Sequence, residues 1–95
     1  MGTPTLTPGA AQAIAHHNHE ADQAHLRALQ ALRDYNQAMG RLQAAMVASS
    51  VQDAAQAEAE ADAAWRELQN LLLQGYQHRN SAVIAASLAA DRRAE

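Results

Sequence analysis

The chain contains no cysteine and no phenylalanine, and its 95 residues include only one Trp, two Tyr, two Pro and four Gly. Without cysteine there are no disulfide bonds and no thiolate chemistry. The scarcity of proline and glycine leaves long stretches in which a helix meets no breaker. These absences favour long helices that no covalent cross-link holds together.

Positive charge is also scarce and dispersed, with seven basic residues against ten acidic ones and a net charge of −3. Nucleic-acid binding needs a concentrated basic surface, which scattered arginines do not provide. The longest strongly apolar run, Leu71-Leu72-Leu73, is far too short to span a membrane, and no basic residue precedes Arg27. We therefore expect no nucleic-acid partner, no membrane insertion, and a location that is cytoplasmic or reached by export without a cleaved signal peptide.

Large apolar side chains are few, because 25 of the hydrophobic residues are alanine. A chain of this length with so few large side chains has difficulty in stabilising a compact monomer. Association supplies the missing core, so we expect a protein partner or self-association as a homo- or hetero-oligomer.

Strong helix formers dominate from Pro8 onward. Thr7 is suited to cap a helix that begins at Pro8, and residues 1–7 before it have no periodicity and are expected to form a flexible arm. The stretch "ASSVQD" contains the best candidate turn, because Ser50 and Asp53 have the spacing of a capping box.

This pattern predicts an all-α fold, an antiparallel helical hairpin within residues 8–95 that packs into a larger helical bundle or oligomer. The expected elements are a helix at 8–48, a turn at about 49–50 and a helix at 51–92. Since neither Gly nor Pro marks the turn, one uninterrupted helix is the alternative.

Apolar residues recur at steps of three and four along both predicted helices, as in helices packed lengthwise against each other. The residues predicted to pack in this way, within the chain or at an interface, are Leu32, Tyr35, Met39, Leu42, Met46, Trp65, Leu68, Leu72 and Tyr76.

Four of the five histidines lie within ten residues, in "AIAHHNHEADQAHLRAL" at 13–29. Imidazole and carboxylate groups that share a helix face are suited to a divalent transition metal. The candidate metal ligands are therefore His16, His19, Glu20, Asp22 and His25. A solvated helix face or a pH-sensitive contact through His25 fits the pattern better, and no metal or other cofactor is expected. The fifth histidine, His78, is isolated in the sequence and is expected to be exposed.

No nucleophile with a base and no phosphate-binding glycine loop is present, so we expect no enzymatic activity. The sequence favours a structural or adaptor subunit that assembles through coiled-coil-like helix packing. Alternatives are a partner-specific chaperone, or a metal- or pH-responsive helical protein that uses the histidines at 16–25.

Two resemblances support an assembly role. The stretch "ELQNLLLQGYQHRNSAVIAASLAAD" at 67–91 resembles the second helix of type III secretion needle subunits. The length, alanine content and hairpin plan resemble the WXG100 family of type VII secretion. Both resemblances imply small helical hairpins that are exported without a cleaved leader, and they suggest a place in a secretion apparatus or a phage-like particle. They carry no functional residue over to this chain.

Overall fold

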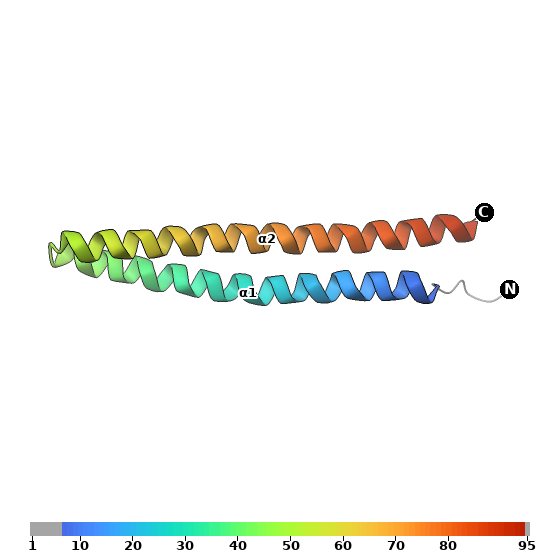
Figure 1. The fold of residues 1–95 in the computed structure, drawn as a ribbon, viewed down its shortest axis with the longest axis horizontal. Coiled ribbons are helices and arrows are strands. Elements are labelled where there is room, and N and C mark those ends of the chain that lie inside the picture. The colour runs from blue at the N-terminus through green and yellow to red at the C-terminus, as the bar shows by residue number, and fades with distance from the viewer. Residues whose placement is uncertain (1–6, 95) are drawn as a thin grey trace. The chain divides into compact units, whose positions relative to one another are not determined.

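The computed structural model describes residues 7–94, with side chains described as far as Asp91. It contains two helices, α1 (Pro8–Val47) and α2 (Val51–Ala94), which run in opposite directions from a short turn (Figure 1). The expected all-α helical hairpin is confirmed, and the turn excludes one uninterrupted helix. The arm expected at 1–7 lies outside the described residues except for Thr7.

The start of α1 is fixed by its cap. The Thr7 hydroxyl accepts a hydrogen bond from the backbone N–H of Ala10 at 3.1 Å, and the Thr7 carbonyl accepts one from Ala11 at 2.9 Å. Pro8 then occupies the first helical position, where its missing N–H leaves no hydrogen bond unmade.

The turn is built from hydrogen bonds that close α1 and open α2. The N–H of Ser50 donates to the carbonyl of Ala45 at 2.9 Å, and that of Ser49 donates to Met46 at 3.1 Å. This is the Schellman arrangement, and Ser49 takes the left-handed conformation that it requires, with φ of 57°. The Ser50 hydroxyl then accepts from the N–H of Asp53 at 3.4 Å and caps α2.

The chain divides into two compact units. We call His25–Leu72 the turn unit, and we call Met1–Ala24 together with Leu73–Glu95 the terminal unit, described here at 7–24 and 73–94. In each unit a segment of α1 contacts a segment of α2.

The contact between helices in the turn unit is a seam of mostly small residues. Its buried cluster joins Ala28 and Ala31 of α1 to Leu68 and Leu71 of α2. The buried or half-buried positions recur at steps of three and four, as in a coiled coil. These seam positions are Ala28, Ala31, Tyr35, Ala38, Leu42 and Ala45 on α1, and Ala54, Ala57, Ala61, Ala64, Leu68 and Leu71 on α2.

The terminal unit has a seam with the same spacing. Ala21 and Ala24 of α1 lie beside Gly75 of α2, where an added Cβ would stand 3.7 Å from the Cβ of Ala24 and 3.8 Å from the carbonyl oxygen of Ala21. These are ordinary van der Waals distances, so the site has room for a methyl group. Ala82 is buried in the same unit.

Replacing Ser49 by glycine is expected to stabilise the fold by about 1 kcal/mol, because glycine adopts a positive φ without the Cβ penalty. Thermal unfolding of the full chain measures the effect. Ala48→Gly is the matched control: it has no positive φ to relieve, and it is expected to be neutral or destabilising. A lower melting temperature for Ser49→Gly than for the parent chain would contradict this account of the turn.

Candidate functional site

The predicted packing residues divide into two groups. Tyr35, Leu42 and Leu68 lie in the seam of the turn unit. The other six are between 40% and 69% exposed: Leu32, Met39, Met46, Trp65, Leu72 and Tyr76. The seam therefore differs from the predicted stripe, because alanines with the same seven-residue spacing take the positions between the helices.

Five of these exposed residues share one geometrical rule. Leu32, Met39 and Met46 each directly follow a seam alanine of α1. Trp65 and Leu72 each directly follow a seam residue of α2. In an antiparallel pair of helices, positions of this kind flank the same side of the seam. We call these five residues, all in the turn unit, the apolar face.

A groove opens on the apolar face between the two helices. It has a volume of about 630 Å³, and its lining includes Tyr35, Met39, Leu42 and Trp65. The rings of Tyr35 and Trp65 touch, with centroids 5.3 Å apart and planes at 47°. Glu58 and Asp62 also line the groove, and Asp62 is paired with Arg66 at 2.9 Å.

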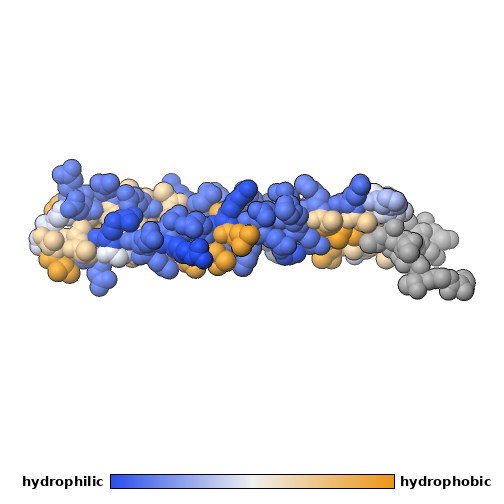
Figure 2. Space-filling view, turned by 90° about the horizontal axis from the view of Figure 1, so that it is seen from below, coloured by the Kyte–Doolittle hydropathy of each residue, from blue (hydrophilic) through white to orange (hydrophobic). Residues whose placement is uncertain are grey.

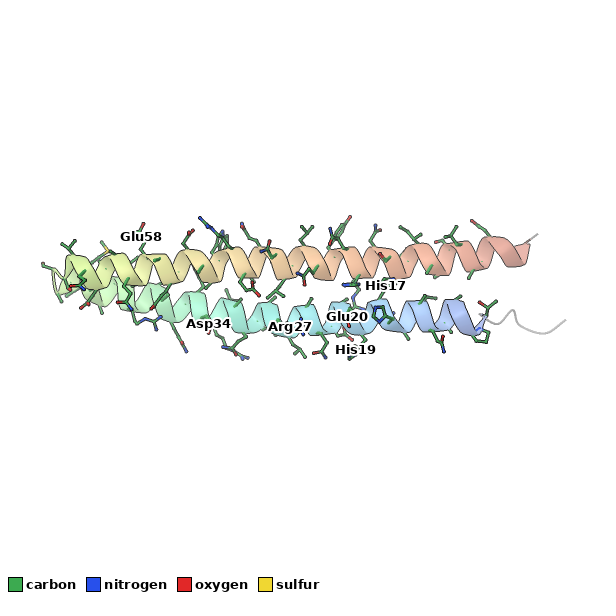
Figure 3. All side chains as sticks on the ribbon, viewed as in Figure 1. His17, His19, Glu20, Arg27, Asp34 and Glu58 are labelled. Carbon is green, nitrogen blue, oxygen red and sulfur yellow. The ribbon has the colours of Figure 1, made fainter. Side chains whose placement is uncertain are left out.

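Several residues that directly precede seam positions are charged instead. They are exposed and form what we call the polar face: Arg27, Asp34, Arg41, Glu60 and Glu67. Figure 3 labels two of them, Arg27 and Asp34, on α1. Hydrophilic residues also dominate the view in Figure 2, where hydrophobic residues appear as separate patches.

An ion pair crosses the seam on the polar face. Nη2 of Arg41 lies 2.6 Å from Oε2 of Glu60. The hydrogen bond from Arg41, followed by its positive charge, lowers the pKa of Glu60 below its usual value of 4.5. The two flanks of the same seam thus differ: large apolar side chains predominate on one, where Glu58 and Asp62 also line the groove, and charged side chains predominate on the other.

The histidines are arranged differently from the prediction. His17 and His78, from opposite helices of the terminal unit, approach with their Nδ1 atoms 3.0 Å apart. Both are half-buried. The prediction that His78 is isolated and exposed is therefore wrong. Figure 3 shows His17 on the side of α1 that faces α2, whereas His19 points away.

The other candidate ligands do not gather around this pair. His19 is exposed, and so is His25, which is absent from the seam where a pH-sensitive contact was expected. Glu20 is half-buried, and Asp22 is bound by Arg79. His16 does lie nearby, with its ring centroid 5.4 Å from that of His17.

Arg79 of α2 also donates a 2.9 Å hydrogen bond to the Asn18 side chain, so it links α2 to two residues of α1 in the terminal unit. Within residues 7–94 no three or more His, Cys, Asp or Glu side chains are placed to hold a metal ion. The sequence did carry one signal for the histidine pair: positions 17 and 78 both fall in phase with the alanine seam.

No family model, curated protein or solved structure matches this chain. No helix in the described part of the chain is long and apolar enough to cross a membrane.

The Arg41–Glu60 pair predicts a pH-dependent contribution to stability. Since the folded-state pKa of Glu60 is lowered, its ionised form stabilises the fold above about pH 4.5, and the contribution is lost as pH falls through the folded-state pKa. Arg41→Ala is expected to lower the melting temperature slightly at pH 7, with the difference shrinking at about pH 3. Arg33→Ala, whose guanidinium contacts Gln30, is the control. A pH-independent effect of Arg41→Ala would argue against the pair.

The histidine pair predicts an energetic coupling across the terminal unit. One Nδ1 must donate and the other accept, so removal of either ring removes the bond. In a double-mutant cycle at pH 8, His17→Ala and His78→Ala are expected to couple by about 0.5–1.5 kcal/mol. The exposed pair His19→Ala and His25→Ala should be additive. Additive effects at His17 and His78 would mean that the rings do not interact.

Proposed function

We propose that this chain is a non-enzymatic structural or adaptor subunit that assembles with other helices through its apolar face. The observation that carries the proposal is the contrast between the two flanks of the turn-unit seam. Large apolar side chains line one flank, and Arg41, Glu60 and other charged groups line the other. A helix pair that stayed free in water would gain nothing from this contrast, whereas a subunit that docks on one side would need it.

Burial of the apolar face against a partner would contribute a free energy that is large relative to the stability of a small domain. Full burial of a Leu, Met or aromatic side chain contributes about 1.5–3 kcal/mol, so completing the burial of a half-exposed one contributes about 1 kcal/mol. The five residues of the face, 40–67% exposed, together offer about 5 kcal/mol. That sum is close to the whole stability of many small domains.

The interior of the chain supports the same conclusion. Nine of its eleven buried hydrophobic residues are alanine, and no large side chain is fully buried among the described residues. Alanine withdraws little apolar area from water, so the seam determines how the helices pair more than it stabilises them. Assembly would supply the missing burial.

The resemblances to secretion-system hairpins agree with such a role, and we place the assembly in a secretion apparatus or a phage-like particle. A role as a chaperone for one partner would use the same face on a foreign helix. The metal- or pH-responsive alternative has less support, because His19 and His25 are exposed and Asp22 is engaged by Arg79.

The proposal is tested with tagged chains expressed in the native cell and lysates separated by size. The parent chain is expected in a complex larger than its 10.2 kDa monomer, and Leu32→Asp is expected to shift it to monomer size. Leu26→Asp is the control, because Leu26 is also exposed, at 59% against 40% for Leu32, but lies outside the apolar face. If the parent chain and Leu32→Asp both migrate as monomers, the assembly role is refuted.

A variant inside the seam separates folding from assembly. Leu68 belongs to the buried cluster, so Leu68→Asp is expected to reduce helicity in circular dichroism as well as assembly. Leu32→Asp is expected to affect assembly more than helicity.

A further inference from the structure

We propose that the partner on the apolar face is a second copy of this chain, which docks the same face across a two-fold axis so that the two turn units form a four-helix bundle. This inference rests on the proposed assembly function and names its partner.

The first argument is the surface that the chain exposes. Its accessible surface is 7006 Å², whereas a compact monomer of 10.2 kDa would expose about 5300 Å². The excess is about 1700 Å², and a standard protein interface withdraws about 800 Å² from each partner. The chain as a whole therefore exposes more than enough extra surface to supply one partner's share of a standard interface.

The second argument is the shape of the face. A two-fold interface has to be complementary to itself, with protrusions and recesses on the same surface. The apolar face has both: the groove between Met39 and Trp65, and the exposed side chains of Leu32, Met46 and Leu72 along the same flank.

The third argument is the spacing of the face. Leu32, Met39 and Met46 follow one another at seven-residue intervals, as do Trp65 and Leu72. A stripe of this period fits a helix that has the same period. A second copy of the chain has the same stripe of apolar residues, with the same period, on both of its helices.

The composition and charge of the face agree with this partner. Trp, Tyr and Met are the residues enriched at the centres of protein interfaces. Two acidic residues, Glu58 and Asp62, line the groove, and Arg66 neutralises Asp62, which removes one of the two negative charges that a second copy would meet there. The Arg41–Glu60 pair lies on the opposite flank, where it stays in water when the apolar face docks.

Sedimentation of the purified full chain tests the inference. The parent chain is expected at twice 10.2 kDa at micromolar concentration. Met39→Glu places a charge in the groove and is expected to weaken the dimer by about a hundredfold or more. Leu26→Glu, outside the face, should sediment as the parent chain does. A monomeric parent chain, a species larger than two copies, or an unaffected Met39→Glu variant would each overturn the inference.

A milder variant guards against a Met39→Glu chain that does not fold. The sequence has no cysteine, so Met39→Cys introduces a single site for a nitroxide label. Labels at position 39 are expected to show stronger dipolar coupling between copies than labels at Leu26→Cys. Equal coupling at the two positions would place the interface elsewhere. If the purified chain is monomeric but the complex in cells still depends on Leu32, this inference fails while the proposed function stands.

Discussion

The small size of the residues between the two helices is the constraint on which the rest of the structure depends. In the turn unit the seam is alanine at most positions, and its buried cluster contains just two larger residues, Leu68 and Leu71. Small seam residues let helix backbones approach closely, so only a few larger side chains, such as Leu42, Leu68 and Leu71, fit between them. The larger side chains therefore lie beside the seam, where one helix pair cannot cover them.

Because the larger side chains lie beside the seam, buried alanines and exposed large residues recur with the same seven-residue repeat. Ala31 is 3% exposed and the adjacent Leu32 is 40% exposed, and Ala38 and Met39 form the same contrast at 1% and 40%. On the other flank, charged groups such as Arg41 and Glu60 precede the seam positions and form an ion pair across it. A single seven-residue pattern thus contains the positions of the seam, of the polar face and of the apolar face.

Local features of this fold are readable from the sequence, whereas the pairing of the helices is not. The caps at Thr7 and Ser50 were predictable because their hydrogen bonds join residues three or four apart. The seam was not, since the alanine stripe and the stripe through Leu32 and Met39 have the same period and differ only in phase. Side-chain size favours the stripe through Leu32 and Met39 as the buried one, but close packing of the helices buries the alanine stripe instead. Positions 17 and 78 both fall in phase with the alanine seam, but phase alone did not predict the contact between His17 and His78, because that contact also depends on the register of helices whose contacting residues are 61 apart.

Each unit has one contact between two rings that distinguishes one helix register from another, which a stripe of alanine alone does not do. A uniform alanine stripe repeats every seven residues, so a shift of one helix by that distance would still match alanine with alanine. Tyr35 against Trp65 in the turn unit and His17 against His78 in the terminal unit each occur at one register only. A polar pair in a seam specifies register at some cost in stability, and the hydrogen bond between the imidazoles reduces that cost. The contact between the imidazoles therefore fits one register of the terminal unit, as the contact between the two aromatic rings fits one register of the turn unit.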